Sequence, residues 1–322
     1  MVTHGWWATA MTLLVSALVV SPISLRAQEP TPEQEPPAVR FKSSVDVVRV
    51  SAVVRDHKGR FVRDLGANDF EVFDRGQLER ISDFRDDLSG VSIALLFDVS
   101  GSMESKLANA REAAAHILSW LDASQDEAAI FTFDTHLDEV TPFTANLKSL
   151  PDSLSALVPF GATSLHDAIA ATARRVSARE GRRHAVIVLT DGVDNASRLT
   201  ASEVSGIASG IDVPVYIFGI VAGIDNPSSE EATSSAARTA LGGTLADLAE
   251  WTGGHVVVAS TPGQRSVAAR QIIDELRHQY LIAFESSGTP GWHPLVVRAR
   301  DKDLTVRARS GYIAGQSRPN TH

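Results

Sequence analysis

One stretch of the sequence, Val91 to Met103 (VSIALLFDVSGSM), constrains the fold more than any other. Its first seven residues are almost all apolar, which is the pattern of a strand buried on both faces, as in a parallel sheet. Three oxygen-bearing side chains, Asp98, Ser100 and Ser102, follow at the carboxyl end of that strand. Open α/β sheets bind their ligands at the edge formed by the carboxyl ends of their parallel strands. A carboxylate and two hydroxyls there are hard oxygen ligands of the kind that Mg²⁺ prefers.

This D-x-S-x-S pattern, followed by an Ala-rich segment, resembles the opening of a von Willebrand factor A domain. In that family the pattern begins a metal-ion-dependent adhesion site, which also takes a Thr from a Gly-containing loop and an Asp after another buried strand. Thr163 lies in such a loop (FGATSL), and Asp191 follows the apolar run AVIVLT. The resemblance therefore implies metal ligands at Asp98, Ser100, Ser102, Thr163 and Asp191. The competing interpretation is a set of unrelated turn residues, because Asp and Ser are common in turns.

The resemblance also implies what such a site does. In the family, the Asp that corresponds to Asp191 usually acts through water, so few anionic ligands surround the ion and it stays electrophilic. We expect Mg²⁺, whose bound waters can be exchanged for a carboxylate oxygen, although the same ligand types also suit Mn²⁺ and Ca²⁺. The expected partner is a protein that presents Asp or Glu. We therefore predict a metal-dependent protein–protein interaction or adhesion module of the cell envelope, and not an enzyme.

Two other functions stay open at this point. One is a metal-dependent hydrolase that activates water, and the other is a structural envelope protein whose metal site has no function. The ten His are scattered, and the sequence has no H-E-x-x-H, G-x-S-x-G or P-loop motif. His166 follows the Thr163 loop but is expected to face solvent. Asp167 either orients a ligand or interacts with the helix dipole from the first turn, and Asp194 and Asn195 are interpreted as loop residues.

Composition excludes several classes of protein. The chain of 322 residues has no cysteine, which excludes disulfides, thiolate metal sites and a Cys nucleophile. Its formal net charge is −9 and its basic residues form no stripe, so nucleic acid is not an expected partner. With 43% apolar residues, the chain can build one large domain and a smaller one.

The first residues have the features of an export signal. Trp6 to Val20 is almost entirely apolar or small, and a small-residue cleavage point follows at Ala27. We expect residues 1–27 to be a signal peptide that is cleaved off. The alternative is an uncleaved membrane anchor, and only in that case do we expect the protein to contact a membrane. Residues 28–39 are rich in Pro and Glu and form a linker. The predicted location is periplasmic, cell-surface or secreted.

The remaining chain predicts two folded parts. In residues 89–278, buried strands and helices alternate, which predicts an α/β fold with a doubly wound, mostly parallel sheet and helices on both faces. In residues 40–88 and 279–314, apolar and polar residues alternate with period two between turn signals. We therefore expect the two segments to build one small antiparallel β-sandwich-like unit together. Within it, residues 295–299 are predicted to form a hairpin with residues 304–308.

Several further segments complete the predicted organisation. The sequences VRDHKGRFVRDL, DFEVFDRG and VRARSGYIA resemble the β regions that flank the A domain in bacterial exported proteins of the von Willebrand factor A-related group. The Ser-, Ala- and Thr-rich residues 221–243 follow a predicted buried strand. They are either a surface insertion or a loop that overhangs the metal. Residues 315–322 are a loose tail.

Overall fold

The structure is a computed structural model that describes residues 47–86, 90–179, 181–221, 243–286 and 288–314. The predicted export signal, the linker, residues 222–242 and the tail lie outside these ranges. Within them, no helix combines the length and the apolar character needed to cross a bilayer.

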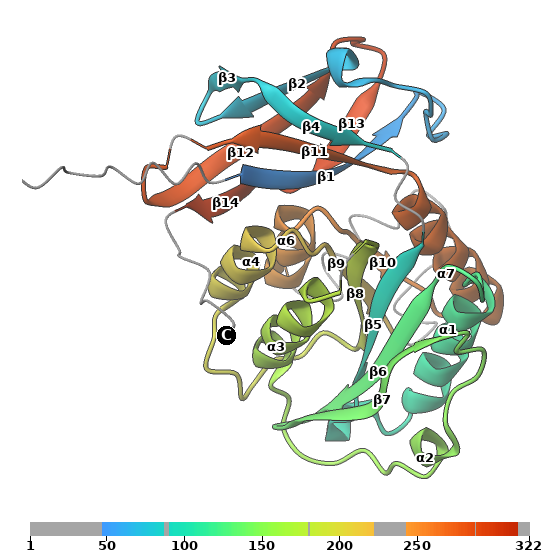
Figure 1. The fold of residues 1–322 in the computed structure, drawn as a ribbon. Coiled ribbons are helices and arrows are strands. Elements are labelled where there is room, and N and C mark those ends of the chain that lie inside the picture. Colours follow the sequence, from blue (N-terminus) through green and yellow to red (C-terminus); the bar gives the residue numbers. More distant parts are fainter. Residues whose placement is uncertain (1–46, 87–89, 180, 222–242, 287, 315–322) are drawn as a thin grey trace, which may run out of the picture. The chain divides into compact units, whose positions relative to one another are not determined.

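A six-stranded sheet forms the centre of the larger part of the fold (Figure 1), in the order β10-β9-β8-β5-β6-β7. All neighbouring strands pair in parallel except β7, which runs antiparallel to β6 at the sheet's edge. The strand that ends in Asp98 is β5, and it lies between β8 and β6. The predicted mostly parallel sheet is confirmed. Its strands are β5 (Val91–Asp98), β6 (Glu127–Phe133), β7 (Leu137–Ala145), β8 (Arg183–Thr190), β9 (Val215–Gly219) and β10 (Val256–Val258).

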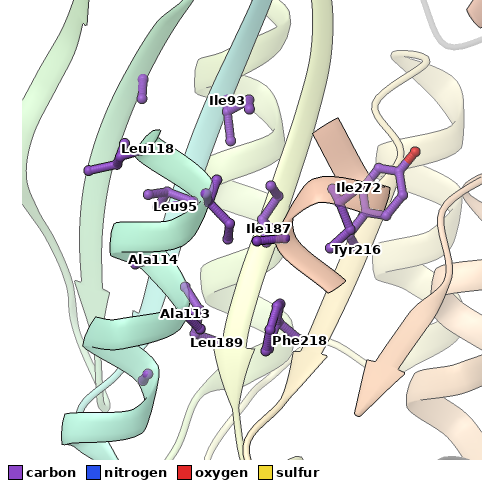
Figure 2. Packing of buried hydrophobic residues seen from close by; sticks show 14 of the residues in the cluster. Ile93, Leu95, Ala113, Ala114, Leu118, Ile187, Leu189, Tyr216, Phe218 and Ile272 are labelled. Atoms are coloured by element: carbon purple, nitrogen blue, oxygen red, sulfur yellow. The ribbon is translucent and has the colours of Figure 1, made fainter. Parts of the chain in front are cut away.

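Helices cover both faces of this sheet, as predicted. One apolar cluster joins α1 and α7 to one face, and a second joins α3, α4 and α6 to the other. Each strand serves both clusters by alternation: in β5, Ile93 and Leu95 face α1 and α7, whereas Ala94 and Leu96 face α3. Figure 2 shows the first of these clusters. The helices are α1 (Leu107–Ser119), the short α2 (Asp152–Ser155), α3 (Leu165–Ser177), α4 (Ala201–Gly210), α6 (Gly243–Trp251) and α7 (Pro262–Arg277).

The helix α4 is absent from the sequence prediction. Half of its ten residues are Ser or Gly, which have low helix propensity and hide its apolar period. A local signal was nevertheless present, because Thr200 and Glu203 form a reciprocal capping box at its start. Tertiary packing completes the helix, since Val204 and Ala208 are fully buried against the sheet.

Two four-stranded antiparallel sheets form the smaller part of the fold, in the orders β13-β1-β11-β4 and β14-β12-β2-β3. Each sheet combines strands from before and after the central α/β region. The pairing of β1 with β11, for example, brings Val47 opposite Glu285 and Val53 opposite Gln279. The predicted β-sandwich-like unit made from both ends of the chain is therefore confirmed. Its strands are β1 (Val47–Arg55), β2 (Phe70–Asp74), β3 (Gln77–Glu79), β4 (Ile81–Arg85), β11 (Gln279–Glu285), β12 (Gly291–Ala299), β13 (Thr305–Ala308) and β14 (Gly311–Ala314).

The predicted hairpin between residues 295–299 and 304–308 is wrong. The strand β12 pairs with β2 and β14, whereas β13 pairs with β1 in the other sheet. The Asp301 turn, where the Asp303 N–H donates to Asp301 Oδ1 at 2.9 Å, carries the chain from one sheet to the other. Both segments alternate with period two, so the sequence pattern alone cannot distinguish a hairpin from a change of sheet.

A buried cluster of polar side chains joins the two parts of the fold. Glu275 of α7 is fully buried, and it accepts a hydrogen bond from Tyr216 at 2.7 Å and pairs with Arg55 at 3.2 Å and with Arg307. Arg307 also donates to His255 Nδ1 at 3.2 Å, so this ring nitrogen accepts and the imidazole is neutral. Burial and the charges of Arg307 and Arg55 lower the pKa of His255 to about 3.

This cluster predicts a loss of stability in acid. His255 takes up a proton in the unfolded chain as the pH falls below its usual pKa of about 6.5 but resists doing so in the fold, so the stability present above that pH is lost toward pH 3. A quarter of its side chain is exposed, which weakens the effect. The wild type is expected to lose about 1–2 kcal/mol more than His255→Gln between pH 7 and pH 5. Urea unfolding at both pH values measures this difference, and equal losses in the two proteins would contradict it.

Candidate metal centre

The carboxylate of Asp98 lies fully buried at the carboxyl end of β5. The Ser100 backbone N–H donates to its Oδ1 at 2.9 Å, and the Thr190 hydroxyl donates to its Oδ2 at 2.6 Å. Burial raises the pKa of Asp98 and the neighbouring charge of Asp191 raises it further, while the hydrogen bonds from Ser100 and Thr190 act in the opposite direction. The fold therefore keeps an acidic group where its charge is disfavoured unless a cation lies nearby.

Ser102 lies in a 3₁₀ turn, Gly101–Met103, which begins shortly after β5, and Ser100 is the residue directly before this turn. Met103 anchors this turn because its side chain is fully buried, and its backbone N–H donates to the Ser100 carbonyl at 3.0 Å. Ser100 Oγ and Ser102 Oγ lie 3.2 Å apart. Neighbouring ligands of an octahedral Mg²⁺ lie roughly 3 Å apart, because each is about 2.1 Å from the ion. The spacing of these hydroxyls suits two positions of one coordination shell.

The loop that carries Thr163 lies directly against this turn. The Phe160 N–H donates to the Val99 carbonyl at 3.0 Å, and the Gly101 N–H donates to the Gly161 carbonyl at 3.1 Å. Gly161 has φ of +86°, a left-handed conformation that favours glycine. Thr163, two residues further on, is buried.

A third loop, which follows β8, reaches the same place. The Asn195 and Ala196 N–H groups donate to the Thr163 carbonyl at 3.1 and 3.0 Å, and Asn195 Oδ1 accepts from the Thr163 N–H at 2.8 Å. Asp191 begins this loop. The structure thus ties the three loops that carry the predicted ligands to one another through backbone hydrogen bonds.

Asp191 has two carboxylate oxygens in different environments. Oδ2 accepts from the Lys106 ammonium at 2.8 Å, and Lys106 is the residue that precedes α1. Oδ1 is buried and has no hydrogen-bond partner among the described residues. A buried acceptor without a partner is costly, so this oxygen is positioned for a water molecule or an ion that is bound at the site.

Residues next to the predicted ligands in the sequence make hydrogen bonds that hold the loops together. Asp194 Oδ2 accepts from the His166 N–H at 2.9 Å and from the Ser197 hydroxyl at 2.6 Å, and Asp167 accepts from the Arg198 and Leu199 N–H groups. The expectation that His166 faces solvent is wrong. Only 14% of its side chain is exposed, because the ring packs against the Leu199 carbonyl and Asp194.

Comparison with protein families decides the identity of this region. Residues 93–193, which include every predicted ligand, match the family model described as von Willebrand factor type A domain. This chain carries a von Willebrand factor type A domain. The comparison with curated proteins returned no match.

Several solved structures are similar to the chain at low identity. An aerotolerance-related membrane protein from Bacteroides fragilis is 20% identical, over 58% of this chain and 98% of its own, with a TM-score of 0.47. A von Willebrand factor type A protein from Catenulispora acidiphila is 15% identical, over 84% of this chain and 73% of its own, with a TM-score of 0.44. Proximal thread matrix protein 1 from the mussel byssus, with a zinc-occupied MIDAS motif, is 17% identical, over 63% of this chain and 49% of its own, with a TM-score of 0.43.

The side chains of this A domain fit the ion that the family implies. Within the described ranges, no three His, Cys, Asp or Glu side chains gather closely enough to bind a metal by themselves. Any ion at this edge would therefore depend on hydroxyls, and Ser100 and Ser102 supply two at a suitable spacing. The unpartnered Asp191 Oδ1 adds a buried acceptor. An all-oxygen set of this kind favours Mg²⁺, Mn²⁺ or Ca²⁺ over softer metals.

Two side chains of the A domain that sequence reasoning missed contact the predicted ligands. Thr190 ends the apolar run AVIVLT, and its hydroxyl donates to Asp98 Oδ2. Lys106 immediately precedes α1, and its ammonium pairs with Asp191, 85 residues away. No local signal identifies Lys106, because the contact depends on how β5 and β8 pair.

Substitution of Asp98 by Asn is expected to separate stability from metal binding. Because burial disfavours the ionised carboxylate, the variant in EDTA should be more stable than the wild type by about 1 kcal/mol. Added Mg²⁺ should raise the melting temperature of the wild type and leave that of Asp98→Asn unchanged. Thermal unfolding with and without Mg²⁺ measures both effects. Asp303→Asn, at an exposed turn, is the control that should behave as the wild type.

Proposed function

We propose that this protein is a metal-dependent protein-binding module of the cell envelope, which binds an acidic side chain of a protein partner through a Mg²⁺-type ion. The observation that carries this proposal is that the loops bearing the predicted oxygen ligands also bear exposed apolar side chains. Such a combination suits recognition of a protein surface, because specific interfaces combine an apolar core with a few oriented polar contacts.

The apolar side chains lie on the loops that carry the predicted ligands. Val158 and Phe160 precede Thr163 and are 82% and 80% exposed, the largest values for big apolar residues in the described part of the chain. Val193, two residues after Asp191, is 45% exposed. Because backbone hydrogen bonds connect these loops, we propose that the three side chains form a rim at the site. An exposed apolar rim of this kind is typical of interaction sites.

The bound ion would supply an electrophile for a partner's carboxylate. Asp98, Ser100, Ser102 and Thr163 would hold it, and Asp191 would act through water. Hydrogen bonds from Ser100 and Thr190 fix the orientation of Asp98. The backbone contacts among the loops fix the positions of the hydroxyls. The rim would pack against apolar side chains next to the partner's acidic residue and exclude water from the contact.

The proposed location is the periplasm, the cell surface or the medium, on the strength of the N-terminal export signal predicted from the sequence. The hydrolase and the inert scaffold are the alternatives that the experiment below distinguishes. Nucleic acid is not a proposed partner, since the net charge is −9.

A pull-down from envelope extract tests the metal requirement. The mature protein is expected to retain a partner in Mg²⁺, to lose it in EDTA and to regain it when Mg²⁺ is restored, because the ion forms the contact. Asp98→Ala should retain none, while Asp303→Asn should behave as the wild type. Retention unaffected by EDTA would support the scaffold, and metal-dependent turnover of a test substrate would support the hydrolase.

A substitution in the rim tests the interaction surface separately from the metal. Phe160→Ser should weaken capture of the same partner by about tenfold or more, since exposed aromatic side chains at interface centres often contribute over 1–2 kcal/mol. Its Mg²⁺-induced rise in melting temperature should be unchanged. Leu78→Ser is the matched control, because Leu78 is 60% exposed but belongs to β3 of the β unit. Equal capture by Phe160→Ser and Leu78→Ser would contradict a role for the rim.

A further inference from the structure

The predicted metal site contains a cation that belongs to the chain itself. The Lys106 ammonium lies 2.8 Å from Asp191 Oδ2, and 30% of the Lys106 side chain and 5% of the Asp191 side chain are exposed. Most surface ion pairs contribute little to stability, but the carboxylate of this pair is buried, so water and salt screen the pair only in part. The contact joins α1 to the end of β8, so it connects two of the loops at the site.

The negative charges of the site explain why a cation is favourable at the position of Lys106. Asp98 and Asp191 are both buried and close enough that the charge of one affects the other. Two buried carboxylates repel each other unless a cation offsets them. Lys106 offsets the charge of Asp191 on its Oδ2 side, while Oδ1 stays buried without a partner.

We propose that Lys106 competes with the divalent ion for the negative charge of Asp191 and so sets the affinity of the site for metal. This inference rests on the proposed metal-dependent function and concerns how tightly the ion binds. A unit charge a few ångströms from a divalent ion in a partly buried site repels it strongly enough to change affinity by an order of magnitude.

The formal charges show why such a lysine suits a binding module. Asp98 and Asp191 sum to −2, and a divalent ion alone would neutralise them. With Lys106 included, the loaded site has a net charge of +1, which one carboxylate of a partner cancels. Lys106 thus disfavours the ion alone and favours the ion together with an acidic partner.

Isothermal titration of the EDTA-treated protein with Mg²⁺ tests the competition. Lys106→Gln removes the charge and keeps a hydrogen-bond donor, and it should lower the dissociation constant for Mg²⁺ by roughly tenfold. Lys106→Arg keeps the charge and should bind Mg²⁺ as the wild type does. Lys302→Gln, in the exposed turn between β12 and β13, controls for the loss of one positive charge and should change nothing.

A second readout separates competition from a purely structural role. In EDTA, Lys106→Gln should melt at a lower temperature than Lys106→Arg, because Asp191 loses its cation. In saturating Mg²⁺ the two variants should melt at closer temperatures. Unchanged or weaker Mg²⁺ binding by Lys106→Gln would overturn the inference while leaving the proposed function intact. Absence of Mg²⁺ binding in the wild type would overturn the proposed function itself.

Discussion

Two acidic side chains, Asp98 and Asp191, lie buried at one edge of the central sheet, and the arrangement around them is the constraint on which the site depends. Burial disfavours the charge of Asp98 and raises its pKa, and the nearby charge of Asp191 raises that pKa further. The surrounding groups offset this cost only in part: Thr190 and Ser100 donate hydrogen bonds to Asp98, and Lys106 pairs with Asp191. Buried charge of this kind is common at functional sites and would be a liability in a purely structural edge.

The fold brings these groups together through its topology. Parallel strands end at the same edge of the sheet, so Asp98 at the end of β5 and Asp191 after the neighbouring β8 emerge side by side. Backbone hydrogen bonds from Phe160, Gly101 and Asn195 then fix the loops against one another. Elsewhere in the fold, the buried Glu275 of α7 pairs with Arg55 and Arg307 of the β unit. This buried cluster thereby connects the β unit to the domain that carries the site.

The features that could be predicted from the sequence are those with a local signal. The run of apolar residues before Asp98 identified a central parallel strand, and period-two patterns at both ends identified the β unit. The features that could not be predicted depend on distant contacts. Lys106 meets Asp191 only once β5 and β8 are adjacent, and β13 joins β1 rather than β12 because the chain changes sheet after Asp301. The burial of His166 likewise depends on the Leu199 loop, 33 residues away.

In the site that we propose, the oxygens of Asp98, Ser100, Ser102, Thr163 and Asp191 surround one divalent ion. Anomalous diffraction from crystals soaked in Mn²⁺ measures this most directly. If the proposed site binds the ion, one strong peak should lie at the end of β5, with the Ser100 and Ser102 hydroxyls about 2.0–2.6 Å from it. Asp191 should contact this ion through an intervening water. A peak elsewhere, or no peak at this edge in crystals that bind Mn²⁺ at other positions, would contradict the account.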